Sequence, residues 1–346
     1  MNQEWNDFLA QQGANPSWLD FGSPVDEVKR AQSGSIIVPL QDLGIIRATG
    51  ADATPFLHNL LTNDVEALSA NAAGRFGFCT PKGRLLATFL VWRENDDYLL
   101  AVSADLHAAM LKKLSMYVLR SKVKLTDATQ ERLLIGIAGS HALAALSEHF
   151  PLPPAPMHTT HHDTATVIRV GEERAIVAVK ATPEADGSEA ARKLWSSLQT
   201  QHAIQPAGLH AWHWLDIMAG IPQITLLTQE EFIPQMINYE VIGGVSFKKG
   251  CYPGQEIVAR TQYLGKVKRR MYRAHLETGA PQAGVAVFST ETGDQVCGMV
   301  VTAAPAPQGG HDALLVIPSN CAEAGQLHLG SLDGALMALQ PLPYAV

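Results

Sequence analysis

Apolar positions in residues 32–131 recur with the two-residue period of strands and, in between, with the near four-residue spacing of helices. An aspartate that can cap a first helical turn, Asp52 or Asp105, precedes each of the two helical stretches. Strands combined with helices that cover one face are typical of an α+β fold. The predicted strands of this module lie at 36–40, 44–48, 76–79, 85–92, 98–102 and 123–126.

Residues 1–31 precede this module and contain one short predicted helix, at residues 5–11. Proline and glycine at Asn15-Pro16 and at Gly22-Ser23-Pro24 break any longer element. We therefore expect these residues to form an N-terminal arm.

Residues 132–206 form a second predicted module, in which strands and helices follow one another in a compact ferredoxin-like arrangement. The strands are predicted at 133–138, 167–170 and 175–179, and the helices at 141–150 and 189–198. A stretch in this module contains His158, His161, His162 and Asp163, which is compatible with a metal site or with a solvated loop. No second ligand group at a known spacing accompanies it, so we predict no metal.

The chain is then expected to return to the first module, over residues 207–265, through a helix at 210–218. This helix carries Trp212 and Trp214, which can either fill the core or stack on a planar ligand. Residues 266–346 contain only short predicted strands between glycine and proline turns. They indicate a small C-terminal β-barrel, with strands at 285–289, 296–303, 314–318 and 336–340.

Composition favours a globular protein that does not span a membrane. The 346 residues are 47% hydrophobic and 17% charged, which is enough for two or three domains with their own cores. The first residues carry acids where a secretory signal needs cations, and no apolar run approaches the roughly 20 residues that cross a bilayer. We expect a cytoplasmic protein that is a monomer.

Charge is distributed unevenly along the chain. Residues 247–273 hold eight basic residues and one acid, an excess of +7. The whole chain has a net charge of −7, so the remaining residues together carry −14. This segment can attract an anionic small molecule or an acidic protein, or it can be a solvated strand pair. The acidity of the whole chain argues against direct binding of nucleic acid.

Four cysteines are present, far apart and without a Cys-x-x-Cys pair, so we expect free thiols rather than disulfides or a four-thiolate metal site. The chain also lacks GxGxxG, P-loop and GxSxG motifs, the usual signals of nucleotide and serine-hydrolase chemistry.

Residues 248–256, Lys-Lys-Gly-Cys-Tyr-Pro-Gly-Gln-Glu, are here called the thiol loop. Two glycines and a proline predict a turn that exposes Cys251, and the charges of Lys248 and Lys249 favour its thiolate form. Gln255 and Glu256 open a predicted helix whose N-terminal amides face the same loop. The alternative is an ordinary turn with a solvated cysteine.

The run Phe232-Ile233-Pro234-Gln235 and the run from Gly243 to Arg260 resemble the signature of the YgfZ family, folate-binding proteins that assist iron-sulfur cluster assembly. Weaker similarity to that family and to the aminomethyltransferase (T-protein) of the glycine cleavage system extends from about Ile36 to the C-terminus. The resemblance implies an aminomethyltransferase-like fold with two mixed α/β modules around a central cavity, and a C-terminal β-barrel.

The same resemblance implies tetrahydrofolate or a derivative as cofactor, without a tightly bound metal. It also implies iron-sulfur client or assembly proteins as partners, and a connection to tRNA modification. It suggests Cys251 as the functional thiol, with Lys249 beside it. The implied folate-binding residues are Trp212, Met218, Tyr252, Gln255, Glu256 and Arg260.

The sequence departs from the T-protein where that enzyme carries charge. Ala87 or Thr88 stands at the place of its catalytic aspartate, and Met218 stands at the place of the glutamate that holds the pterin. None of these side chains can ionise, so loss of aminomethyl transfer is expected. Met218 also departs from the acidic residue that is often present in YgfZ-like proteins, and Leu43 replaces a tryptophan found in some of them, which predicts weaker pterin affinity.

Three hypotheses about function therefore stand. The first is a folate-binding accessory protein for iron-sulfur cluster assembly or repair. The second is a folate-dependent one-carbon transferase, which turnover of a methylamine donor would support. The third is a scaffold whose basic segment docks an acidic partner, which indifference to substitution of Cys251 would favour.

Overall fold

The computed structural model describes residues 2–181, 187–263, 265 and 267–346. The chain divides into two compact units. The first unit comprises Met1–Phe56, Glu66–Gly74 and Phe89–Trp212, and the second comprises Leu57–Val65, Arg75–Thr88 and His213–Val346.

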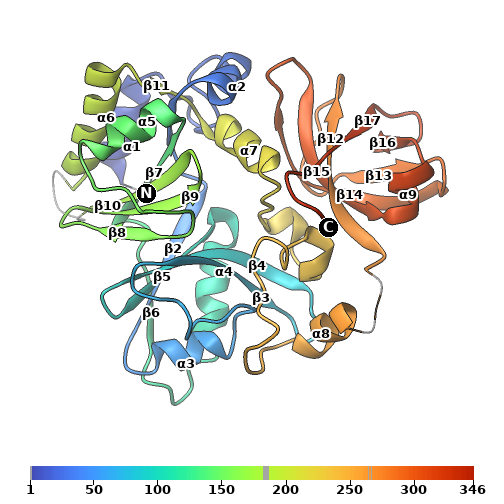
Figure 1. Ribbon diagram of the computed structural model, residues 1–346, viewed down its shortest axis with the longest axis horizontal. Coiled ribbons are helices and arrows are strands. Elements are labelled where there is room, and N and C mark those ends of the chain that lie inside the picture. The colour runs from blue at the N-terminus through green and yellow to red at the C-terminus, as the bar shows by residue number, and fades with distance from the viewer. Residues whose placement is uncertain (1, 182–186, 264, 266) are drawn as a thin grey trace. The chain divides into compact units, whose positions relative to one another are not determined.

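The first unit contains a six-stranded sheet with the order β11-β1-β7-β10-β9-β8. Its pairs are antiparallel except for β1 with β11. The helices α1 (Gln3–Gln11), α5 (Ser140–Ser147) and α6 (Glu189–His202) pack with this sheet around one apolar core (Figure 1). The strands are β1 (Ile36–Pro39), β7 (Arg132–Ala138), β8 (Thr159–His161), β9 (Ala165–Gly171), β10 (Arg174–Lys180) and β11 (Gln205–Pro206).

Residues 1–31, for which we expected an arm, contribute directly to this core. Trp5 on α1 is buried, and its ring meets that of Trp195 edge to face, with 5.7 Å between the centroids. A second helix, α2 (Pro24–Ser33), was not predicted. Its Glu27 is fully buried and accepts hydrogen bonds from the backbone amides of Phe21, Ser23 and Gly208. Burial of a carboxylate is tolerated because these amides satisfy it.

A second sheet has the order β3-β4-β5-β2-β6, and all its registered pairs are antiparallel. Helix α4 (Ala104–Ser115) covers β2, β5 and β6, as the four-residue apolar spacing predicted. The strands are β2 (Leu43–Thr49), β3 (Ala73–Cys79), β4 (Leu85–Glu94), β5 (Asp97–Ser103) and β6 (Lys124–Asp127). Helix α3 (Ala53–His58) follows β2.

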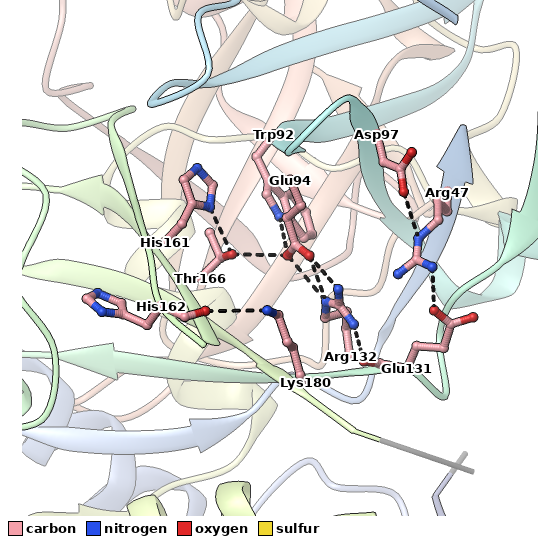
Figure 2. A network of polar contacts seen from close by, with 10 residues as sticks. All are labelled: Arg47, Trp92, Glu94, Asp97, Glu131, Arg132, His161, His162, Thr166 and Lys180. Carbon is pink, nitrogen blue, oxygen red and sulfur yellow. Dashed lines mark hydrogen bonds and ion pairs between the residues drawn. The ribbon is translucent and has the colours of Figure 1, made fainter. Parts of the chain in front are cut away.

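A buried ion pair lies within the first unit, between Glu94 at the end of β4 and Arg132 at the start of β7 (Figure 2). The carboxylate also accepts hydrogen bonds from Trp92 at 3.2 Å and from the Thr166 hydroxyl at 3.1 Å. Burial alone raises the pKa of Glu94, but the hydrogen bond and charge of Arg132 outweigh it, and the pKa lies below its usual value.

His161 belongs to this network and ends a strand instead of lying in a loop, although its side chain is exposed, as the solvated interpretation of the histidine-rich stretch expected. It is the last residue of β8, with Nδ1 3.1 Å from the Thr166 hydroxyl and Nε2 2.9 Å from the carbonyl oxygen of Ala70. Both ring nitrogens thus have protein partners, which leaves neither free to bind a metal.

The second unit contains the closed barrel that the C-terminal pattern predicted, with the order β12-β15-β14-β13-β16-β17. Its core includes Cys297 and Cys321, the latter on α9 (Ser319–Ala324), a helix that the pattern did not predict. The strands are β12 (Arg269–Leu276), β13 (Ala286–Ser289), β14 (Gly293–Pro305), β15 (His311–Pro318), β16 (Leu327–Leu329) and β17 (Leu336–Gln340).

The predicted helices at 210–218 and after Gln255 are present as α7 (Leu209–Met218) and α8 (Gln255–Tyr263). Two short 3₁₀ helices, η1 (Leu226–Thr228) and η2 (Pro234–Ile237), lie between them. Within the part of the chain that the structure describes, no helix has the length and apolar character needed to span a membrane.

Candidate functional site

The thiol loop is anchored in the second unit by the side chain of Lys249. This lysine is 8% exposed, and its ammonium group donates hydrogen bonds to the carbonyl oxygens of His58 and, at 2.6 Å, Leu61. Its Nζ also lies 4.9 Å from the ring centroid of Tyr252. Carbonyls at the end of α3 lack helical partners, so the lysine satisfies them and fixes the start of the loop.

Gly254 fixes the other end of the loop. Its φ is +81°, and a Cβ atom at this position would lie 2.4 Å from the carbonyl oxygen of Thr80 and 2.6 Å from Cα of Gly83. The loop therefore packs, backbone against backbone, on the turn at residues 80–83. Only glycine combines this conformation with this approach.

Cys251 is exposed between these two anchors, whereas the other three cysteines are buried. Burial raises the pKa of Cys79 to about 12. Burial, with Cys321 beside it, also raises the pKa of Cys297 to about 12. At neutral pH these buried thiols are neither accessible nor ionised. The structure thus leaves Cys251 as the cysteine that solvent and reagents can reach.

The predicted cofactor-binding residues next to Cys251 differ in exposure. Tyr252 is buried, and its hydroxyl has no hydrogen-bond partner among the described residues. Burial, and then the nearby Cys79, raises the pKa of Tyr252, so its hydroxyl stays protonated. On α8, Gln255 is partly buried, and Glu256 and Arg260 are exposed.

Helix α8 is hydrogen-bonded to the first part of the signature, residues 232–235. The buried side chain of Gln235 on η2 donates a hydrogen bond of 2.7 Å to the carbonyl oxygen of Val258. The two parts of the signature therefore meet at this helix, through two residues that are 23 apart in sequence. The predicted site residues Lys249, Cys251, Tyr252, Gln255 and Glu256 all lie within the thiol loop.

Trp212 lies in the first unit and is only 5% exposed. Gly136 on β7 has no room for a Cβ atom, because the indole would be 2.6 Å from it. The guanidinium carbon of Arg174 lies 5.3 Å from the ring centroid. These contacts account for the burial of Trp212 without a ligand. Of the two alternatives given by the sequence, they agree with a tryptophan that fills the core.

Met218 and the second tryptophan of α7 have partners within the second unit. The sulfur of Met218 contacts the guanidinium of Arg273 at 2.7 Å. Trp214 donates a hydrogen bond from Nε1 to the carboxylate of Asp312 on β15, at 2.8 Å. Met218 therefore offers a weak acceptor, already in contact with a cation, where the T-protein carries a charge.

The positions that align with the T-protein's catalytic aspartate have structural roles. Ala87 is fully buried, and the hydroxyl of the buried Thr88 accepts a hydrogen bond from the amide of Ile224 at 3.0 Å. Neither side chain can transfer a proton at neutral pH.

His58 and Asp64 also lie beside the thiol loop, although their sequence did not mark them. Nδ1 of His58 is 3.3 Å from a carboxylate oxygen of Asp64. Nε2 of His58 lies 3.7 Å from the position that a Cβ atom on Gly250 would occupy. A histidine six residues before an aspartate carries no recognisable signal, because the segment between them has to turn back before the two side chains meet.

The segment between His58 and Asp64 is tied to Gly243 and Gly244, which precede the thiol loop. The Thr62 hydroxyl donates to the carbonyl oxygen of Gly244 at 2.6 Å, and the Asn63 amide donates to that of Gly243 at 2.7 Å. The histidine, the aspartate and the loop are therefore positioned by one set of hydrogen bonds.

Comparison with known proteins identifies the family to which the chain belongs. Residues 11–242 match the GCVT N-terminal domain. The chain is 31% identical over 313 residues to the tRNA-modifying protein YgfZ of Photobacterium profundum, covering 90% of this chain and 92% of the relative. It is 30% identical over 324 residues to that of an Enterobacter species, covering 93% and 97%.

The fold agrees with these matches. The glycine cleavage system aminomethyltransferase T from Bartonella henselae superposes with a TM-score of 0.78 over 99% of this chain and 97% of that one, at 18% identity. The aminomethyltransferase-like fold and the C-terminal barrel expected from the sequence are therefore confirmed. The chain belongs to the YgfZ family and carries the GCVT N-terminal domain.

Proposed function

We propose that this protein is a folate-binding accessory protein that supports assembly or repair of iron-sulfur clusters in client enzymes, with Cys251 as its working thiol. The observation that carries the proposal is the placement of Cys251. It is the exposed cysteine of four, on a loop that Lys249 and Gly254 anchor at both ends. A fixed, accessible thiol can bind a soft metal, accept sulfur or attack a disulfide.

Folate binding is supported by the family and by the chemistry near the loop. The buried hydroxyl of Tyr252 lacks a protein partner, and a polar ligand ring would satisfy it. Arg260 and the basic segment 247–273 suit the anionic tail of a reduced folate. Bound folate would supply a pterin to which Tyr252 donates a hydrogen bond, while Gln255, Glu256 and Arg260 orient its polar groups.

Client enzymes explain how a protein of this charge relates to tRNA. The relatives are named tRNA-modifying proteins, yet this chain has a net charge of −7, which disfavours direct contact with a polyanion. We infer that its clients include cluster-dependent enzymes that modify tRNA. The protein would then act on the enzyme and not on the nucleic acid.

Two measurements test the proposal. Titration of the purified protein with tetrahydrofolate, followed by tryptophan fluorescence, should saturate. A deletion strain carrying Cys251→Ser should lose cluster-dependent enzyme activity under oxidative growth, while the variant still folds and binds folate. Full rescue by Cys251→Ser would show that the thiol is incidental and would favour the scaffold hypothesis.

The similarity of fold to an aminomethyltransferase favours one alternative, a folate-dependent one-carbon transferase. Ala87, Thr88 and Met218 argue against it, because none provides a charged group for proton transfer. Release of formaldehyde equivalents from a methylamine donor, dependent on tetrahydrofolate, would support the alternative.

A further inference from the structure

We propose that His58, positioned by Asp64, is the proton acceptor that converts the thiol of Cys251 into a thiolate. The inference rests on the proposed function, in which Cys251 is the working thiol. It assigns a role to two residues outside the signature, both of which belong to the second unit together with the loop.

The placement of the imidazole relative to the loop is the first argument. His58 is 8% exposed, and its Nε2 points to Gly250, the residue directly before Cys251, at 3.7 Å from the site of a Cβ atom. Lys249 binds the backbone carbonyl of the same histidine. The loop is thus in contact with the histidine at two adjacent residues, Lys249 and Gly250, which directly precede Cys251.

The pairing with Asp64 sets the tautomer of the ring. An ionised carboxylate only accepts hydrogen bonds, so the Nδ1 atom that faces it at 3.3 Å carries the hydrogen. Nδ1 is buried and makes no hydrogen bond of ordinary geometry to any described residue, while the carboxylate of Asp64 faces it within ion-pair distance. In the neutral imidazole Nε2 is then unprotonated, and it is directed at the loop.

The step itself conserves atoms and charge. The proton on Sγ of Cys251 moves to Nε2, which leaves a thiolate and an imidazolium, and the carboxylate of Asp64 stabilises the imidazolium. A carboxylate oxygen of Glu66 lies within 4.8 Å of the pair, and as an anion it also stabilises the imidazolium. Lys249, Lys248, Tyr252 and Cys79 are further charged or titratable groups near the loop. The two lysines are cations, a carboxylate is a weaker base than an imidazole, and burial raises the pKa values of Tyr252 and Cys79, so none of these groups competes as proton acceptor at neutral pH.

The experiment is the rate at which iodoacetamide alkylates Cys251 between about pH 5 and about pH 10, a range that spans histidine and thiol ionisation. The modified peptide is quantified by mass spectrometry. At neutral pH, His58→Gln should react about tenfold more slowly than wild type and recover at high pH, where the thiol ionises unaided. Asp64→Asn should show a smaller loss.

His107→Gln is the matched control. His107 is 9% exposed and has its Nε2 3.4 Å from Asp127, but it lies in the first unit on α4. This variant also loses a buried histidine that faces an aspartate, so it distinguishes the general effect of such a loss from the specific effect of losing His58. The control should keep the wild-type profile.

The proposal is overturned if folded His58→Gln gives the wild-type pH–rate profile. It is equally overturned if the rate falls by the same factor at every pH, because that pattern indicates a distorted loop. Neither outcome touches the proposed function, which fails only if Cys251→Ser restores cluster-dependent activity or if reduced folate does not bind.

Discussion

The anchoring of the thiol loop can be tested by replacing Gly254 with alanine. The substitution forces a side chain into φ +81° and sets its Cβ atom 2.4 Å from a backbone oxygen and 2.6 Å from a backbone carbon. A left-handed conformation costs an L-residue about 1–2 kcal/mol. Overpacking against atoms that cannot move aside adds about 1–3 kcal/mol.

Gly243 provides a matched comparison in the same unit. Its φ is +76°, but no atom lies within 4 Å of the position of a Cβ atom. Gly243→Ala therefore incurs the conformational cost alone, offset by about 0.4–1 kcal/mol from the less flexible unfolded chain. The same offset applies to Gly254→Ala, so we expect a net destabilisation of about 1 kcal/mol for Gly243→Ala and about 2–4 kcal/mol for Gly254→Ala.

The assay is thermal unfolding of both variants, with hydrogen exchange to locate the change. For a unit of this size, 1 kcal/mol shifts Tm by about 2–4 °C, so Gly254→Ala should melt about 4–16 °C lower and Gly243→Ala only about 2–4 °C lower. Exchange should accelerate in the thiol loop and at residues 80–83 in the first variant. Equal melting temperatures for the two variants would refute the close contact between the loop and the turn.

Three further predictions concern other residues. Cys251 should react with iodoacetamide in the folded protein while Cys79 does not, and peptide mapping of the modified cysteines checks this. Cys79→Ala should give the same Cys251 reactivity as wild type; alanine is preferred to serine here because a buried unpaired hydroxyl costs about 1–3 kcal/mol. Because Arg132 lowers the folded-state pKa of Glu94, its contribution to the stability of the first unit is complete above the unfolded-state value of about 4.5 and is lost as the pH falls through the lower folded-state value. In urea unfolding, the free energy of unfolding of Glu94→Gln should be about 3–5 kcal/mol below that of wild type at neutral pH, and this difference should become smaller in acid. Trp212→Ala should destabilise the first unit by about 3–5 kcal/mol, and folate titration of the variant would reveal a role in binding that packing alone does not explain.

Much of the architecture follows from local patterns. The helix after Gln255, the apolar stripe of α4 and the barrel after residue 268 were all predicted, because each element shows its own period or its own turn residues. The thiol loop was recognisable for the same reason, since its glycines, proline and cysteine lie within nine residues.

Contacts between distant residues were not predictable in this way. The sequence placed Lys249 beside Cys251 as a charge that favours the thiolate, but folding buries its ammonium on two carbonyls that precede it by almost two hundred residues. The N-terminal residues looked like an arm, because one short helix between breaks carries no sign of the sheet it packs against. Trp5 is nevertheless in the core.

The chain alone therefore determined which residues have the chemistry, and the tertiary structure decided which of them can use it. Four cysteines are equivalent in composition, yet three are enclosed and one is exposed. His58 and Asp64 are unremarkable in sequence, and only the turn between them brings the carboxylate to the ring and the ring to the loop. Exposure and pairing depend on long-range packing, whose partners no local pattern specifies.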